Sequence, residues 1–244
     1  MNSAYDRHVV FPTDLGKSTS KQVEGVSPTV VVPVGSTEQH GPHLPLDTDT
    51  RIADAVAHAV VPTFPPGSAT VAPAIAYGAS GEHQAFAGTL SIGTAALETV
   101  LVEFGRSACA WAPRVVFVNG HGGNVDALVA AVRRLRDEGC DAAWCPCSVP
   151  GGDAHAGHTE TSILLHLSPQ TVRIDERRTG NVAPLAELMS TMRRGGVAAV
   201  SEVGVLGDPT TATAEAGARL FTEMVDACTT WIRCWAPGDD GMLR

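Results

Sequence analysis

The stretch VVPVGSTEQHGPHLPLDTDTR, residues 31–51, joins a run of β-branched residues to a loop rich in glycine and proline. Such a loop at the carboxyl end of a buried strand can direct oxygen and imidazole donors towards one divalent ion. Glu38 and His40 are two residues apart, so in extended backbone their side chains leave on the same face. The loop carries five side chains of metal-ligand types, namely Glu38, His40, His43, Asp47 and Asp49.

Some of these residues have a simpler interpretation when taken singly. His43 and Asp47 could be turn residues, and Asp49 could cap the helix that follows. The whole cluster is better explained by a metal site, because turns and caps do not require so many donors in one loop.

Composition sets outer limits on the class of protein. The chain has 244 residues, of which 44% are hydrophobic and 18% charged, so it can bury one sizeable core. No linker divides it, and a single domain over residues 1–244 is expected. A formal net charge of −9 without Lys/Arg runs argues against nucleic acid or an anionic membrane as a partner.

The ends and the cysteines indicate the compartment. Residues 1–17 have no apolar segment after a basic start, and no stretch has the roughly 18 apolar residues of a membrane span. A cytoplasmic protein is therefore predicted. The six cysteines match no disulfide framework and are predicted to be reduced. Cys145 and Cys147 could bind a soft metal, although one intervening residue is not the usual zinc spacing.

Short apolar runs alternate with helical patterns along the chain, which is typical of parallel βαβ units. The patterns predict strands at residues 29–34, 70–75, 114–118 and 142–145, and helices at 50–61, 94–110, 125–137, from 159, and at 214–235. Residues 171–200 give no clear pattern. In the last helix the apolar stripe is formed by Ala214, Ala218, Phe221, Val225, Cys228, Ile232 and Trp235.

A second polar cluster, NGHGGN at residues 119–124, follows a predicted strand and opens a helix. His121 is thus expected at the carboxyl edge of the sheet, where open α/β folds bind their ligands. Free N–H groups of the glycine-rich turn could hold a carboxylate or an oxyanion. A phosphate loop is less suitable, because the lysine and the glycine spacing are absent. A histidine bonded only to turn backbone is the remaining alternative.

The third cluster, DAHAGHTE at residues 153–160, follows the next predicted strand. Glu160 could simply favour the first turn of a helix. Taken together, the three clusters favour a pair of ions held by Glu38, His40, Asp49, His121 and Glu160, with Asp49 as the bridge. His155 or His158 would then act as the acid/base group.

Four motifs, GSTEQHGPHLPLDTD, NGHGGN, HAGHTETS and GDPTTATAEAG, occur in this order and resemble the creatininase family of metal-dependent amidohydrolases over almost the whole chain. The resemblance implies a creatininase-like three-layer α/β sandwich with a mainly parallel central sheet, two divalent metal ions, amide hydrolysis and a homo-oligomer. By position, Glu38, His40, Asp49 and His121 match the family's metal ligands, and His155 matches its catalytic histidine.

Three departures from the family pattern restrict this transfer. Members that open creatinine have a glutamate ligand at the position of Gly123, so Glu160 is expected to take that role. They also have an aromatic residue where Gly151 and Gly152 stand here, which makes creatinine a poor substrate candidate. Ala87 replaces a common proline and touches no proposed ligand.

Within the family, the sequence most resembles the branch found in mycofactocin systems, which trims a modified precursor peptide near its C-terminus. The implied mechanism is attack of a metal-bound hydroxide on the carbonyl, with His155 as general acid/base. The alternative is a small-molecule amidohydrolase or deformylase, so the partner is a peptide or a small amide. The metals could be Zn, Fe or Mn. The predicted substrate-binding residues are Gly122, Gly123, Asn124 and His83.

Two other classes of protein fit the sequence less well. A metal-binding protein without catalysis would keep the ligands but would have no need of His155. A nucleotide-binding module would need a phosphate-binding lysine, which these loops lack. A pocket lined by Gly151, Gly152 and the loop 76–88 could admit the end of a peptide.

Overall fold

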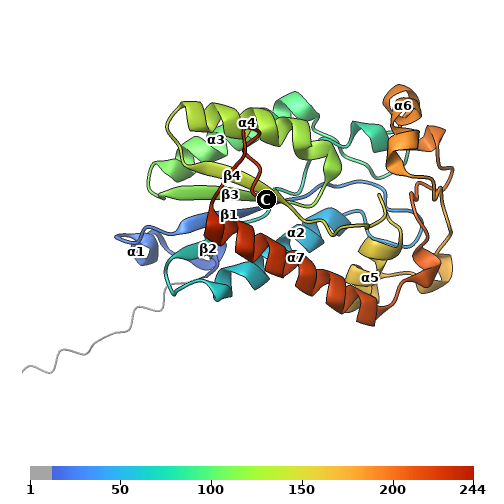
Figure 1. Ribbon diagram of the computed structural model, residues 1–244, viewed down its shortest axis with the longest axis horizontal. Helices are drawn as coiled ribbons and strands as arrows, with labels where there is room; N and C mark the ends of the chain where they lie inside the picture. The colour runs from blue at the N-terminus through green and yellow to red at the C-terminus, as the bar shows by residue number, and fades with distance from the viewer. Residues whose placement is uncertain (1–12) are drawn as a thin grey trace, which may run out of the picture.

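The computed structural model describes residues 13–244, which form three layers around a parallel sheet (Figure 1). Within this range the sheet has four strands in the order β2-β1-β3-β4, and all pairings are parallel. The strands are β1 (Thr29–Val34), β2 (Ala69–Val71), β3 (Arg114–Asn119) and β4 (Ala142–Pro146). The predicted α/β class with a parallel sheet is confirmed.

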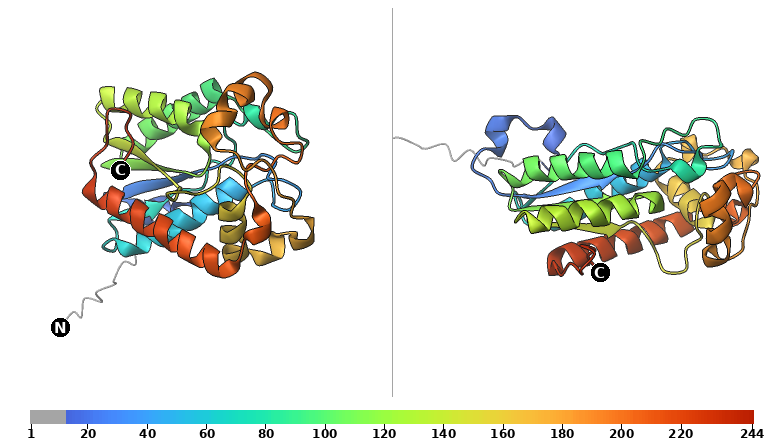
Figure 2. Two further views of the ribbon diagram at one scale, coloured as in Figure 1. Left: turned by 45° about the vertical axis from the view of Figure 1, so that its right-hand side comes forward. Right: turned by 90° about the horizontal axis from the view of Figure 1, so that it is seen from above.

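Alternate side chains of each strand pack into opposite layers, as the two-residue period of a strand requires. Val31 and Val116 pack on one face, whereas Val30, Val115 and Phe117 pack on the other. The first face is covered by α2 (Thr48–Val60), α5 (His158–Leu167) and α7 (Ala214–Cys234). The second is covered by α3 (Thr94–Cys109) and α4 (Val125–Asp137), which lie next to each other in Figure 2.

The α7 helix was predicted correctly in extent, and most of its predicted stripe packs on the core. Cys228 and Ile232 are buried, and Phe221, Val225 and Trp235 pack partly buried against the same cluster, whereas Ala214 is exposed. Gly217 is also buried, where α7 crosses α5. A Cβ at this position would lie 1.8 Å from the Ser162 carbonyl oxygen, so only glycine allows this approach. The close approach of α7 to α5 therefore fixes the rotation of the helix, which the spacing of apolar residues alone did not reveal.

Strand β2 ends earlier than predicted. It stops at Val71, and Ile75 forms only an isolated bridge with Val34. Pro73 lies between these positions and has no N–H to donate to a ladder. The predicted strand 70–75 is thus a short strand followed by one further point of contact with β1.

The remaining elements are short or lie around the carboxyl end of the sheet. Two more α-helices are α1 (Ser20–Val23) and α6 (Leu185–Gly195), the latter within the stretch that gave no clear pattern. Leu188 of α6 packs with Val197 and Leu206 in a small separate cluster. Single 3₁₀ turns occur at Leu15–Lys17, Val61–Thr63, Gly81–His83, Gly122–Asn124, Pro169–Thr171, Ile174–Glu176, Val197–Ala199 and Pro209–Thr211.

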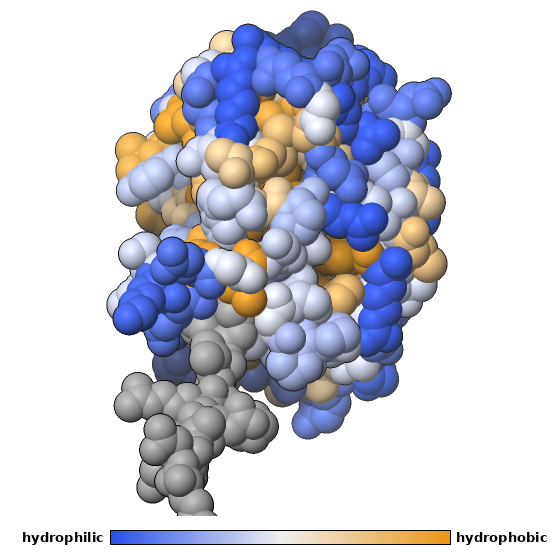
Figure 3. Space-filling view, turned by 90° about the vertical axis from the view of Figure 1, so that its left-hand side faces the viewer, coloured by the Kyte–Doolittle hydropathy of each residue, from blue (hydrophilic) through white to orange (hydrophobic). Residues whose placement is uncertain are grey.

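The two ends of the sheet differ in character. The end where the strands begin presents mainly hydrophilic side chains with scattered apolar patches (Figure 3). At the other end of the sheet, β2 lies on one side of β1 and β3 on the other, so the order of the strands reverses direction at β1. Parallel sheets of this kind bind their ligands at such a switch point. In the part of the chain that the structure describes, no helix is long and apolar enough to cross a membrane.

Candidate metal centre

The loops that follow β1 and β3 begin side by side. Val34 pairs with Asn119 in the parallel register, and the Gly120 N–H donates to the Val34 carbonyl oxygen at 2.8 Å. A Cβ on Gly120 would lie 2.4 Å from the backbone oxygen of Asp49. Only glycine allows the second loop to approach the first turn of α2 this closely.

The first loop delivers two carboxylates and an imidazole into the interior. Glu38, His40 and Asp49 are all buried. Nε2 of His40 lies 3.0 Å from Oδ1 of Asp49. The other oxygen of Asp49 accepts a hydrogen bond from Ser36 Oγ at 2.7 Å. Asp49 stands in the first turn of α2, but it does not cap the helix.

The second and third loops complete the cluster. Nδ1 of His121 is 3.3 Å from Asp49 Oδ2, and its Nε2 is 3.2 Å from Glu38 Oε2. Glu160, in the first turn of α5, approaches His40 Nε2 to 3.8 Å. The structure therefore brings together all five residues that were proposed as metal ligands.

Three sets of donor atoms lie close enough to hold an ion, with all atoms of each set within 4.8 Å of one another. Asp49, Glu38 and His40 each belong to two of them, and Asp49 directs one oxygen towards His40 and the other towards His121, which is the position expected of a bridging carboxylate. The sets are Glu38 with Asp49 and His121, His40 with Asp49 and Glu160, and Glu38 with His40 and His155.

The carboxylate of Glu38 provides a test of whether these residues suit a cation. It is fully buried, and neither of its oxygens accepts a hydrogen bond. A buried carboxylate without donors is unfavourable unless a positive charge balances it. Burial accordingly raises the pKa of Glu38 to about 7. A divalent ion would remove this penalty, so the residues present fit a metal.

Imidazoles and carboxylates in the cluster strongly affect one another's protonation. Burial opposes a charge on His40, but the carboxylates of Asp49, Glu160 and Glu38 together outweigh it and raise the pKa of His40 to about 10. Burial likewise opposes a charge on His121, yet Glu38 and Asp49 hold the pKa of His121 well above its usual value. A mixed set of imidazole and carboxylate donors suits Zn, Fe or Mn.

His155 lies at the edge of this cluster. Its Nε2 is 2.9 Å from the Gln39 carbonyl oxygen and 3.1 Å from the amide nitrogen of the Gln39 side chain. The other nitrogen, Nδ1, is 3.7 Å from Glu38 Oε1. Burial and the neighbouring His40 hold the pKa of His155 well below its usual value, so the ring is neutral. Because His155 also belongs to a donor set, a ligand role is the alternative to an acid/base role.

His158 points elsewhere. Its Nδ1 lies 2.9 Å from Thr211 Oγ1, outside the cluster. The turn before α5 is held by Asp153, which accepts hydrogen bonds from the backbone N–H groups of His158 and Thr159. This turn directs His155 inward and His158 outward.

His83 lies against the carboxylate of Glu38. Its Nε2 is 3.3 Å from Glu38 Oε1, while Gln39 donates to its Nδ1 at 2.8 Å. Burial lowers the pKa of His83 to about 4. The His83 ring also lines the larger cavity. Its contact with substrate stays a prediction.

The other predicted substrate-binding residues fall into two groups. Gly122 and Gly123 line a cavity beside the cluster. Asn124 is fully buried, and its side chain binds the Ala79 N–H and the Gly35 carbonyl oxygen. This gives Asn124 a role in joining loops, and its predicted role in substrate binding remains untested.

Two members of the first polar cluster lie away from the centre. Nε2 of His43 pairs with Thr161 Oγ1 at 2.8 Å, and Asp47 pairs with Arg51 at 2.7 Å. His43 thus joins the first loop to α5, and Asp47 serves the local structure of α2.

The cysteines are all free, as predicted. Cys145 lies 3.9 Å from Cys228, sulfur to sulfur, on the inner side of α7. Cys147 lines a cavity next to Asp49.

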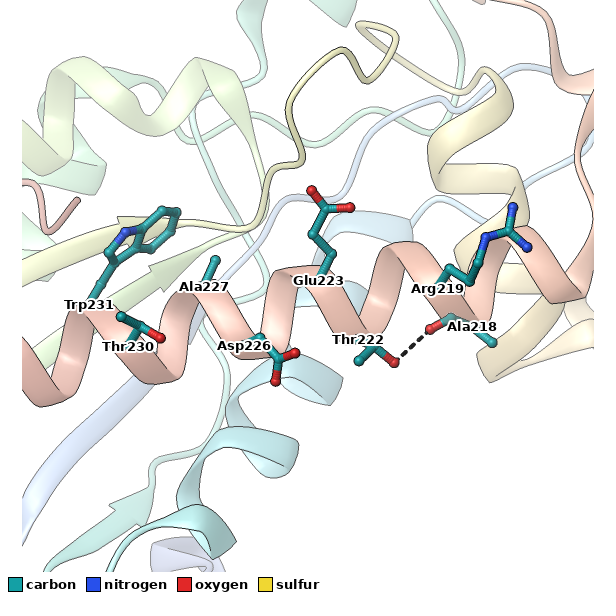
Figure 4. Close-up of a pocket in the computed structure, with 8 residues that line it drawn as sticks. All are labelled: Ala218, Arg219, Thr222, Glu223, Asp226, Ala227, Thr230 and Trp231. Carbon is teal, nitrogen blue, oxygen red and sulfur yellow. Dashed lines mark hydrogen bonds between the residues drawn. The ribbon is translucent and has the colours of Figure 1, made fainter.

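Two cavities meet at the cluster. One of about 230 Å³ reaches Asp49, Glu160 and Cys147, and one of about 570 Å³ runs under α6. Both are lined by His121, Gly122, Ala154 and His155. A further hollow of about 750 Å³ follows the outer face of α7 (Figure 4). Its lining residues, among them Glu223 and Trp231, include none of the candidate ligands.

Sequence patterns did not connect Glu82 or Gln39 with this site. Glu82 Oε1 lies 3.4 Å from His121 Nε2, and Gln39 links His83 to the Gly204 carbonyl oxygen. The only signal for Glu82 was that residues 77–93 form a long, glycine-rich and polar connection, which is typical of functional loops.

A parallel α/β sheet that gathers imidazole and carboxylate donors at its carboxyl edge is an arrangement typical of metal-dependent hydrolases. The family described as creatinine amidohydrolase matches residues 16–232 of this sequence. The chain therefore belongs to the creatininase family of amidohydrolases, enzymes that hydrolyse C–N bonds, as the motifs predicted.

Individual relatives agree with this assignment. The chain is 67% identical over 246 residues to the mycofactocin precursor peptide peptidase of Mycolicibacterium smegmatis, with 100% of both chains covered. It is 63% identical over 250 residues, again with 100% of both covered, to the protein of that name from Mycobacterium tuberculosis strain CDC 1551. A solved mutant creatininase of Zn-Zn type is 25% identical, with a TM-score of 0.78 over 93% of this chain and 99% of that one. The predicted creatininase-like sandwich is thereby confirmed.

Proposed function

We propose that this chain is a metal-dependent peptidase that hydrolyses an amide bond in the C-terminal part of a modified precursor peptide, in mycofactocin biosynthesis. The names of its full-length relatives support this proposal, with four of them 62% to 67% identical. The observation that carries it is the meeting of two cavities at His121 and His155.

A peptide must continue on both sides of the bond that is cleaved. The two cavities both adjoin the proposed centre, because both are lined by His121 and His155, and together they would give a peptide room to continue beyond the cleaved bond. The larger one has an apolar wall under α6, formed by Leu185, Met189 and Met192. A small ring amide would fill only the cavity of about 230 Å³ and would leave the larger one without a role. For this reason a small-molecule amidohydrolase or deformylase is only the second candidate.

The centre would hold two divalent ions, Zn, Fe or Mn. One would bind Glu38, Asp49 and His121, and the other His40, Asp49 and Glu160. When bound, the ions would lower the pKa of a water molecule and polarise the amide carbonyl. Glu160 would thus take the ligand position that Gly123 leaves without a side chain.

His155 would carry the proton. With the ring hydrogen on Nε2, where it can donate to the Gln39 carbonyl oxygen, the free Nδ1 would lie on the side of Glu38. Nδ1 can accept a proton from the attacking water and deliver it to the leaving amine, which restores the neutral ring. The hydrogen bond to Gln39 keeps the ring oriented through both transfers.

A cleavage assay with the synthetic precursor peptide, in modified and unmodified form, tests this proposal. Mass spectrometry should show one C-terminal cleavage that stops when a chelator removes the metal and returns on addition of Zn²⁺, Fe²⁺ or Mn²⁺. Creatinine and N-formyl compounds serve as matched small amides. Hydrolysis of the small amides with an intact peptide would contradict the peptidase proposal and favour the second candidate.

Several expectations about partners and location remain predictions. They are a homo-oligomer, a cytoplasmic location, a single domain over residues 1–244, and no nucleic-acid or membrane partner. Size-exclusion chromatography with light scattering would test the oligomer.

A further inference from the structure

Glu82 reaches the centre from a loop that supplies none of the proposed ligands. It stands in the 3₁₀ turn Gly81–His83, between β2 and α3. Its Oε1 lies 3.4 Å from Nε2 of His121, and 29% of its side chain is exposed in the larger cavity. Glu82 is thus a carboxylate beside a proposed ligand, but it belongs to none of the three donor sets.

The absence of a side chain at Gly123 makes this contact possible. A Cβ there would lie 2.6 Å from Glu82 Oε1 and 2.4 Å from His121 Nε2. It would also lie 2.4 Å from the backbone oxygen of Ala79, which cannot move aside easily. Any larger residue would therefore separate Glu82 from His121.

The two nitrogens of His121 have different surroundings. Nδ1 faces Asp49 Oδ2 at 3.3 Å. Nε2 faces four oxygens, which are Glu38 Oε2 at 3.2 Å, the Ala79 carbonyl oxygen at 3.3 Å, Ser80 Oγ at 3.4 Å and Glu82 Oε1 at 3.4 Å. A neutral imidazole carries one hydrogen, and these acceptors favour its place on Nε2. The lone pair of Nδ1 is then directed to the side of Asp49.

A bound ion would engage the oxygens of Glu38, which accept no hydrogen bond and have the imidazoles of His121 and His83 beside them. Ala79, Ser80 and Glu82 would then remain around the hydrogen on Nε2, and Glu82 is the only one of these three that carries a negative charge. We propose that Glu82 is a positioning residue that accepts this hydrogen from His121 and so directs Nδ1 at the ion shared with Glu38 and Asp49. Carboxylates often orient a ligand histidine in this way. The inference rests on the metal centre proposed above.

Zinc affinity measured by competition with a chelator tests the inference without reference to turnover. Glu82→Ala should weaken one of two Zn²⁺ sites by about 10- to 100-fold, the usual effect of losing such a partner. Glu82→Gln should fall between this variant and the wild type, because its amide oxygen still accepts a hydrogen bond but carries no charge. The isosteric change also guards against misfolding.

Asp126→Asn is the matched control. Asp126 lines the same cavity and carries the same charge, but within residues 13–244 it has no hydrogen bond or ion pair with His121. Its zinc affinity should stay within about twofold of the wild type. NMR of the zinc-loaded protein should show the His121 hydrogen on Nε2 in the wild type and its loss or exchange in Glu82→Ala.

Each outcome supports or overturns a distinct claim. Wild-type zinc affinity in Glu82→Ala would overturn the positioning role and leave the metal centre intact. Equal losses of zinc affinity in Glu82→Gln and Asp126→Asn would show that any negative charge in the cavity has the same effect. That result would also overturn the positioning role of Glu82. If the wild type bound no zinc, Fe²⁺ or Mn²⁺, the metal centre itself would fail.

Discussion

Asp49 and His40 approach each other to 3.0 Å, between Oδ1 and Nε2, where at most 2% of either side chain is exposed. The second oxygen of Asp49 lies 3.3 Å from His121 Nδ1. One carboxylate thus stands between two imidazoles that come from different loops. This is the geometry from which a bridge between two ions is proposed.

Replacement of Asp49 should therefore remove more than one ion. Asp49→Ala should lose more than one equivalent of metal, because both proposed ion sites include this carboxylate. Elemental analysis of the purified variant measures this directly. Asp47→Ala is the control, since Asp47 pairs with Arg51 instead. A full metal complement in Asp49→Ala would refute the bridge.

Glu160 should affect only one of the two ions. Glu160→Gln keeps the size of the side chain and removes its charge, so the site with His40 should lose occupancy while the fold remains. Metal stoichiometry and the circular dichroism spectrum check the two parts of this prediction. If stoichiometry is unchanged, Glu160 serves only to stabilise the first turn of α5.

Metal binding should release protons near neutral pH. The pKa of His40 is raised to about 10, so without metal the ring holds a proton that an ion must displace. Burial raises the pKa of Glu38 and of Glu160 to about 7, so these groups also lose protons to the metal below that pH. Affinity should consequently rise with pH and fall as the solution is acidified.

Calorimetry in buffers of different ionisation enthalpy measures the protons released on Zn²⁺ binding. We expect at least about one proton per ion pair at neutral pH, because ligands must be deprotonated to bind metal. Binding without proton release would contradict the charge state inferred for His40.

The two histidines of the third loop should differ in their effect on catalysis. His155→Ala should keep both metals and substrate affinity but lower kcat by about 10²- to 10⁴-fold, the usual contribution of a general acid/base group. His158→Ala should change kcat much less, because its ring pairs with Thr211 outside the centre.

Metal content separates the two possible roles of His155. It belongs to a donor set with Glu38 and His40, so a ligand role would appear as lost metal instead of lost turnover. Near-normal turnover of the peptide by a metal-replete His155→Ala variant would exclude the acid/base role.

Much of the fold could be predicted because its central strands are buried on both faces. The runs at Thr29–Val34 and Arg114–Asn119 are rich in valine and were identified almost to the residue. The region around α6 was not assigned, although Leu185, Leu188, Met189 and Met192 recur there at three and four residues, because only Leu188 of this short stripe is buried. The rotation of α7 depends on the contact of Gly217 with α5, which no local pattern encodes.

The site was predictable to the extent that its donors follow strands. Glu38 and His121 belong to loops that directly follow β1 and β3, so the parallel topology brings them together. Glu82 comes from the middle of the long connection between β2 and α3, and its approach depends on the missing side chain at Gly123. Such a contact depends on tertiary geometry that sequence spacing does not define.

The central claim is a pair of ions at one carboxylate, and a count of metal ions per chain tests it most directly. Elemental analysis of the purified wild-type protein, after reloading with Zn²⁺, Fe²⁺ or Mn²⁺ and removal of free metal, should give two ions per chain. The same preparation should cleave the precursor peptide only when loaded. Fewer than one ion per chain, together with undiminished peptide cleavage in excess chelator, would contradict the account.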